Sequence, residues 1–112
     1  MNDTVFFTFL DERKQAVTAE IESLTADGRK DEANILKARL NVYDISKAVF
    51  SAAVKQGAAP VEKAFPSSFE KITAPWRASL EQAKAHGDDR KLLIEEAKLA
   101  AVDEITARFA AL

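Results

Sequence analysis

Hydrophobic residues recur every three or four positions along four successive stretches of the chain, which is the spacing of an amphipathic helix. Gly28, the segment from Gly57 to Pro60, and Gly87 separate these stretches. Glycine readily takes the left-handed conformation that ends a helix, so we expect a helix boundary at each of these places. The pattern therefore predicts four helices of about 25 residues each.

The first two stretches differ in how much of their surface is apolar. The first, from about Asp3 to Asp27, has one narrow stripe, interrupted at Arg13 and Lys14 and made of Phe6, Leu10, Val17, Ile21 and Leu24. The second, from about Arg29 or Lys30 to Gln56, has two seams: Ile35, Ala38, Val42, Ile45, Val49 and Ala53, and Leu36, Leu40, Tyr43, Phe50 and Val54. A helix that is apolar on two sides needs neighbours on two sides, so this stretch is predicted to be the central helix.

The third stretch, from about Pro60 to His86, contains all three prolines. Pro66 disfavours helical backbone at the preceding residue, and Ser67 with Glu70 has the spacing of a capping box that starts a new helix. We therefore predict a helical turn, a break at Pro66, and a long helix bent near Pro75.

The fourth stretch runs from about Asp88 or Asp89 to the C-terminus, with Asp88 as its predicted N-cap. Its main stripe consists of Ile94, Ala101, Val102, Ile105, Phe109 and Leu112, and a second flank of Leu92, Leu99 and Ala110. Three charged pairs have the spacing of surface ion pairs on a helix: Lys91–Glu95, Glu95–Lys98 and Glu104–Arg108.

Together these elements predict an all-α fold in a single domain of residues 1–112. Its architecture is two consecutive helical hairpins, most simply a four-helix up-down-up-down bundle with a proline-broken third helix. With 30% charged residues, three glycines and three prolines, the composition is typical of long helices.

Composition and charge exclude several classes of function. The chain has no cysteine, which removes disulfides, thiolate metal sites and cysteine nucleophiles. Its longest uncharged stretches are seven residues, too short to span a membrane, and no basic region precedes the N-terminal apolar patch, so we expect a cytoplasmic protein without a signal peptide. The net charge is −2 and basic residues alternate with acidic ones, which argues against binding to nucleic acid.

No motif for catalysis or cofactor binding stands out. His86 is the only histidine and precedes Gly87, so we expect it to cap a helix end rather than bind a metal. The chain has no metal-ligand spacing, no glycine-rich phosphate loop and no nucleophile elbow. We therefore predict no catalytic, cofactor-binding or metal-binding residues and no cofactor.

One turn has a similarity to a known family. The segment from Ala26 to Ala33 contains a Gly-x-x-x-Glu-Ala sequence that resembles the turn between helices in tetratricopeptide repeats. The 34-residue period of that family is missing, so no function is carried over.

The preferred functional hypothesis is a non-enzymatic interaction module that forms a homodimer or binds a protein partner. Phe7, Phe9, Leu92 and Leu99 lie outside the main inward stripes and are the predicted contact residues. Trp76 is expected in the core, and the ring of Tyr43 is expected to pack while its hydroxyl reaches water. The alternatives are a helix-bundle enzyme, or a subunit of one, that uses Glu, Lys or Tyr, and a helical protein associated with nucleic acid.

Overall fold

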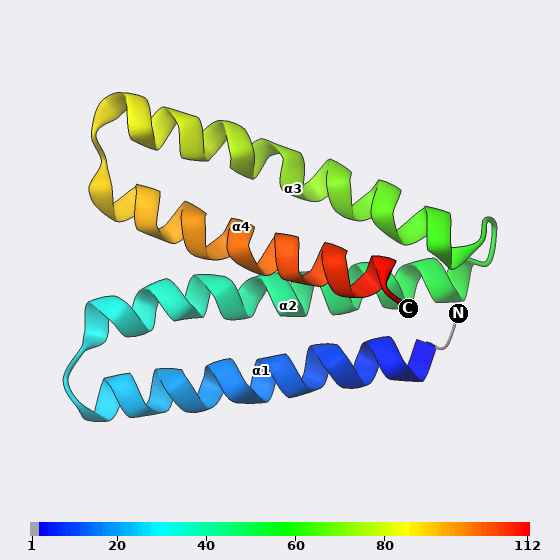
Figure 1. Cartoon of the computed structure of the whole chain (residues 1–112), viewed down its shortest axis with the longest axis horizontal. Coiled ribbons are helices and arrows are strands. Elements are labelled where there is room, and N and C mark those ends of the chain that lie inside the picture. The colour runs from blue at the N-terminus through cyan, green and yellow to red at the C-terminus, as the bar shows by residue number, and fades with distance from the viewer. Residues whose placement is uncertain (1–2) are drawn as a thin grey trace.

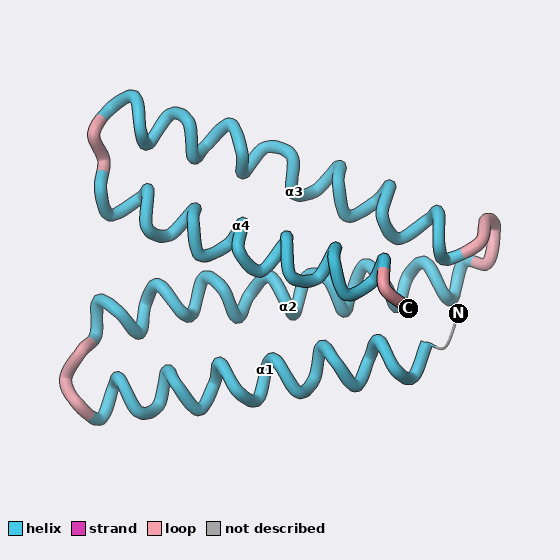
Figure 2. The backbone as a smooth tube through the Cα atoms, in the orientation of Figure 1, coloured by secondary structure: helices cyan, strands magenta, loops and turns pink. Residues whose placement is uncertain are grey.

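The computed structural model describes residues 3–112, which form four long helices joined by short turns (Figures 1 and 2). Helix α1 spans Asp3–Ala26, α2 spans Lys30–Gln56, α3 spans Val61–His86 and α4 spans Asp89–Ala110. Successive helices run in opposite directions in Figure 1. The predicted all-α fold of two consecutive hairpins, arranged as a four-helix bundle, is confirmed.

Local sequence signals set the helix ends close to their predicted positions. Gly87 ends α3 with a φ of 65°, and the His86 ring nitrogen Nδ1 lies 2.8 Å from the carbonyl oxygen of Gln82, which accepts its hydrogen bond. Asp88 then caps α4, because its carboxylate accepts a hydrogen bond from the backbone N–H of Lys91 over 3.1 Å. The predicted roles of His86 and Asp88 at helix ends are confirmed.

The predicted break in the third helix is wrong. Helix α3 is continuous from Val61 to His86 and contains both Pro66 and Pro75, so the predicted new start at Ser67 does not occur. Its buried side chains lie on both sides of Pro66 and on both sides of Pro75: Phe65, Phe69, Thr73 and Ala83. Each interior proline costs a helix about 3 kcal/mol, and each buried phenylalanine recovers about 1.5–3 kcal/mol, so burial of the helical face offsets much of the cost of both prolines.

Pro75→Ala should therefore stabilise the protein. The alanine restores a backbone N–H for the carbonyl of Lys71 and removes the clash of the proline ring, while the unfolded chain gains conformational freedom. The net gain should be about 1–2 kcal/mol in the free energy of unfolding, measured by urea denaturation. A loss of stability on this substitution would mean that the backbone geometry imposed by Pro75 is needed for the packing of α3.

The bundle is flat rather than square. Its dimensions are 44 × 33 × 21 Å, and Figure 1, viewed down the shortest axis, shows the helices in the spatial order α1, α2, α4, α3. Helix α2 packs against each of the other three, which confirms it as the central helix. The fully buried Ser46 of α2 and Ala101 of α4 are small, and small side chains allow two helices to approach closely.

All seven phenylalanines gather in the half of the bundle where the chain termini and the α2–α3 turn lie. Phe6 of α1 is at the centre, with ring centroids 4.7 Å from Phe50, 5.4 Å from Phe65 and 5.2 Å from Phe109. These four rings come from four different helices and are buried. Toward the opposite end α1 and α3 diverge, so the two hairpin turns lie far apart (Figure 1).

Candidate functional site

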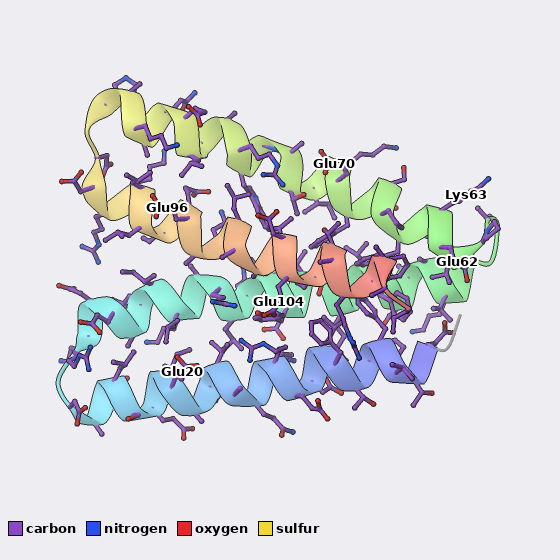
Figure 3. All side chains as sticks on the ribbon, viewed as in Figure 1. Glu20, Glu62, Lys63, Glu70, Glu96 and Glu104 are labelled. Atoms are coloured by element: carbon purple, nitrogen blue, oxygen red, sulfur yellow. The ribbon has the colours of Figure 1, made fainter. Side chains whose placement is uncertain are left out.

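Four polar side chains from three helices meet at the central helix: Arg13 of α1, Arg39 and Tyr43 of α2, and Glu104 of α4, which is labelled in Figure 3. We call them the polar cluster. The Tyr43 hydroxyl donates to Oε1 of Glu104 over 2.6 Å, and Nε of Arg13 donates to the same oxygen over 3.1 Å. Nε of Arg39 donates to the Tyr43 hydroxyl oxygen over 3.3 Å, and its Nη2 lies 3.6 Å from Oε2 of Glu104.

The prediction that the Tyr43 hydroxyl reaches water is wrong. Tyr43 is fully buried, and its hydroxyl is bonded to Glu104 and Arg39. The side chains of Arg39, Arg13 and Glu104 are 25%, 31% and 34% exposed, so they form a partly solvent-exposed rim around the buried phenol of Tyr43. Helix α4 lies over this part of α2, and Glu104 supplies the acceptor that solvent would otherwise provide.

The charges of the polar cluster are complementary. Two guanidinium groups and one carboxylate carry a net charge of +1, and the Tyr43 hydroxyl raises the pKa of Arg13 above its ordinary value, with the charge of Glu104 adding to the effect. Arg13 therefore remains cationic. Because both Glu104 oxygens and the phenol are engaged within the chain, this geometry is suited to holding three helices in register rather than to proton transfer.

One feature of the sequence corresponds to this cluster. The apolar stripe of the first helix stops at Arg13 and Lys14, where an inward position carries charge. The predicted surface pair of Glu104 with Arg108 is wrong, because Glu104 pairs with Arg13 and Arg39, and the guanidinium of Arg108 lies 5.7 Å from the ring centroid of Phe9. Sequence spacing finds partners on one helix, whereas these partners lie on different helices.

Two further ion pairs link α1 to α2 beside the polar cluster. Nζ of Lys14 lies 2.6 Å from Oδ1 of Asp44, and Nζ of Lys47 lies 2.8 Å from Oδ1 of Asp11. All four side chains are substantially exposed, so each pair contributes at most about 1 kcal/mol. The cation lies on α1 in the first pair and on α2 in the second, so a shift of α1 along α2 would separate both pairs. The two pairs therefore favour one register.

The four predicted contact residues are not brought together. Phe7 packs edge-on against Phe50, with 4.9 Å between ring centroids, and Phe9 stacks on Phe6, with 6.1 Å between ring centroids. Both are half-buried in the half of the bundle that holds the phenylalanines. Leu92 is half-buried near the second hairpin turn. Leu99 is only 6% exposed, so the expectation that it lies on a solvent-exposed flank outside the inward stripe is wrong.

The expected surface pair of Glu95 with Lys98 is buried in part. Glu95 is buried, with Oε1 3.4 Å from Nζ of Lys98, while its Oε2 has no hydrogen-bond partner. The same Lys98 ammonium lies 4.3 Å from the ring centroid of Trp76, which packs against the core as predicted. Helix α4 packs against both α2 and α3, so its buried arc includes Leu99 of the predicted second flank and Glu95, as well as most of the predicted main stripe.

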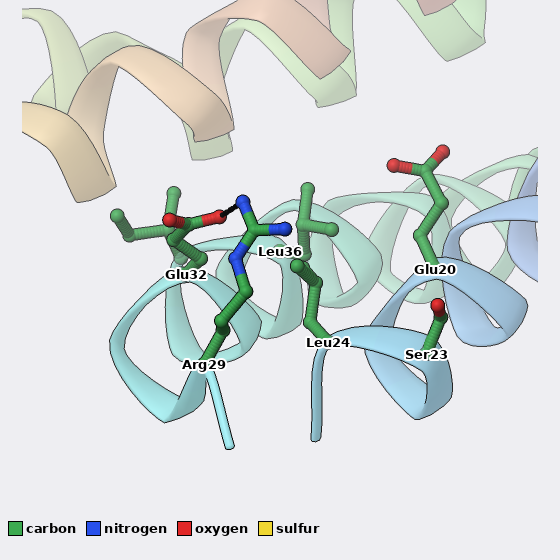
Figure 4. A pocket seen from close by; sticks show the side chains of 7 residues that line it. Glu20, Ser23, Leu24, Arg29, Glu32 and Leu36 are labelled. Carbon is green, nitrogen blue, oxygen red and sulfur yellow. Dashed lines mark hydrogen bonds and ion pairs between the residues drawn. The ribbon is translucent and has the colours of Figure 1, made fainter. Parts of the chain in front are cut away.

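A shallow groove of about 470 Å³ lies at the first hairpin turn (Figure 4). Leu24 of α1 and Ile35 and Leu36 of α2 give it an apolar wall. Its rim carries Glu20 and an ion pair between Arg29 and Glu32. The turn predicted between the first two helices is present between Ala26 and Lys30, and partly exposed apolar side chains lie beside it.

Neither a metal centre nor a known family emerges for the part of the chain that the structure describes. Within residues 3–112, no three His, Asp or Glu side chains are grouped so that they could hold a metal ion. None of the helices formed by these residues has an apolar stretch that would carry it across a lipid bilayer.

Comparison with protein-family models, with curated proteins and with solved structures found no match to this chain, so similarity assigns it to no family.

Proposed function

We propose that this protein is a non-enzymatic assembly module that associates with a second copy of itself as a dimer. The observation that carries the proposal is the divergence of the two hairpins (Figure 1), together with the partial exposure of apolar side chains near the hairpin turns. Leu93 is 50% exposed there, and the half-buried side chains near the two turns include Ile35, Leu36 and Leu92. Apolar surface of this kind favours association.

The amount of uncovered surface agrees with a small interface. The chain exposes 6591 Å², whereas a compact monomer of 12.3 kDa exposes about 6,100 Å². Its radius of gyration is 15.2 Å, compared with about 13 Å for a compact domain of this length. If two copies each covered this excess of about 500 Å², the dimer would bury about 1,000 Å², the lower limit for a specific interface.

The arrangement of polar groups supports an assembly role over the alternatives. An enzyme that used Tyr43 would need access to its hydroxyl, which is buried and bonded to Glu104. Binding to nucleic acid would need free cations on one face. Within residues 3–112, eight cations are instead paired with carboxylates, namely Arg13, Lys14, Arg29, Arg39, Lys47, Arg77, Lys84 and Lys98.

Size-exclusion chromatography with light scattering at micromolar concentration tests this proposal. We expect a mass twice that of the 12.3 kDa chain. Leu93→Asp should weaken the dimer at least about tenfold, because it places a carboxylate in the apolar contact, whereas Leu93 is too exposed for the change to unfold the monomer.

Ile72→Asp is the matched control. Ile72 is 41% exposed, but it lies in the middle of α3, away from the hairpin turns, so the dimer should persist. A native chain that remains a 12.3 kDa species refutes self-association. A dimer that is lost with Ile72→Asp and kept with Leu93→Asp refutes the proposed face.

A further inference from the structure

Both hairpin turns lie at the end of the molecule where the hairpins diverge, one at each edge (Figure 1). We call residues 20–36 the first-turn surface and residues 81–93 the second-turn surface. The first-turn surface contains the shallow groove of about 470 Å³, and the side chains of Leu24 and Leu36 point to the same side of that turn (Figure 4). The second-turn surface contains Leu93, which at 50% is the most exposed large apolar side chain within residues 3–112. One turn therefore offers an apolar recess and the other an apolar projection.

The two surfaces also differ in charge. The first-turn surface has five acidic and two basic residues, a net charge of −3, whereas the second-turn surface has three of each. Glu20 and Asp31 of the first are exposed and make no ion pair within residues 3–112. The same holds for the side chains of Arg90 and Lys91, which precede Leu93 in the second. Two first-turn surfaces would therefore repel each other, whereas the free cations beside Leu93 complement the acidic surface.

We propose that in the dimer the second-turn surface of each copy docks against the first-turn surface of the other. Leu93 packs against the apolar wall that Leu24 and Leu36 form. Arg90 and Lys91 face the acidic residues around that wall. This arrangement rests on the proposed self-association and specifies which surfaces meet.

A two-fold axis parallel to the viewing direction of Figure 1 generates this arrangement. Both turns lie at one end and at opposite edges of the flat bundle. Rotation by 180° about an axis beyond that end therefore places the first turn of each copy opposite the second turn of the other. The contact forms twice, so the pair is closed and covers both surfaces of both copies. A dimer joined by its second turns alone would leave the groove uncovered.

Cysteine cross-linking of the full chain tests this arrangement, because the sequence has no cysteine and an introduced thiol is the only one in its chain. Leu93→Cys is mixed with Leu36→Cys labelled with heavy nitrogen, so that mass spectrometry distinguishes the two chains, and a short bis-maleimide is added after subunit exchange. We expect a covalent product of twice the 12.3 kDa mass that contains one chain of each kind. Neither variant should cross-link alone, because equivalent turns lie at opposite edges of the dimer. Ile72→Cys, exposed in the middle of α3, replaces Leu93→Cys in the matched control and should give no mixed product.

The charge complementarity has a separate test by analytical ultracentrifugation at low salt. Arg90→Glu should weaken the dimer about tenfold, because both contacts then place a carboxylate against the acidic first-turn surface. Lys63→Glu is the matched control, since it changes the net charge equally at an exposed position at the opposite end of the molecule (Figure 3). Its dissociation constant should equal that of the native chain.

The outcomes separate this arrangement from self-association itself. A chain that stays a 12.3 kDa species refutes both. A dimer in which Leu93→Cys or Leu36→Cys cross-links alone, or in which their mixture gives no mixed product, retains self-association and overturns the reciprocal docking. Equal dissociation constants for Arg90→Glu and Lys63→Glu overturn it as well.

Discussion

Phe50→Ala should destabilise the protein by about 3–5 kcal/mol, the largest effect expected of any single substitution in this chain. Phe50 is fully buried, and its ring centroid lies 4.7 Å from that of Phe6, 4.9 Å from Phe7 and 5.6 Å from Phe65. Truncation leaves a cavity among rings from several helices, which cannot all move inward to fill it. Urea denaturation monitored by circular dichroism measures the change in the free energy of unfolding.

The loss is a large fraction of the total stability of a domain of this size, which is about 5–15 kcal/mol. Phe50→Leu keeps most of the volume and should cost about 1–1.5 kcal/mol, so the series remains measurable. Leu93→Ala is the control, since Leu93 is 50% exposed and the change should cost less than about 0.5 kcal/mol. Equal effects of Phe50→Ala and Leu93→Ala would contradict an aromatic centre of the core.

Glu104→Leu should cost about 2 kcal/mol. The change removes the acceptor of the buried Tyr43 hydroxyl and leaves two guanidinium groups without their shared carboxylate. Partial exposure of Arg13 and Arg39 reduces the penalty below that of a fully buried pair. Glu104→Gln retains an acceptor for Tyr43 and should cost about half as much.

Glu95→Leu provides a matched contrast on the same helix. Glu95 is buried with one carboxylate oxygen unpaired, so an apolar side chain of similar size should leave stability unchanged or raise it by about 1 kcal/mol. The two substitutions have the same chemistry and opposite expected outcomes, and both are measured by urea denaturation. If both destabilise equally, the polar cluster has no special role in joining the helices.

The candidate site was much less predictable than the fold. Tyr43 was placed correctly on an apolar seam, but its partner Glu104 is 61 residues away in sequence. The charged interruption at Arg13 and Lys14 indicated that something polar faced inward there, without indicating which helix supplied it. Helical periodicity gives the direction in which a side chain points from the axis of its own helix. It carries no information about which helix lies opposite that side chain.

The unpaired groups on α3 and α4 illustrate the same limit. Thr73 and Glu95 are ordinary helix residues in the sequence, and both are buried with an oxygen that has no partner. Glu95 is buried because α4 packs against both α2 and α3, and Thr73 is buried because α3 packs against both α4 and α2. No pattern of polar and apolar residues on one helix specifies that arrangement.

The sequence by itself determined the four helical stretches, the places of the turns between them and the central position of α2, because these depend on local physics. Gly28 and Gly87 adopt positive φ, Asp88 caps the next helix, and two apolar seams require two sets of neighbours. The tertiary structure decided three features: the continuity of α3 through Pro66 and Pro75, the arrangement of the helices in the order α1, α2, α4, α3 across a flat bundle, and the polar cluster. Each of these depends on burial between segments far apart in the chain, and that burial outweighs the local preferences that the sequence displays.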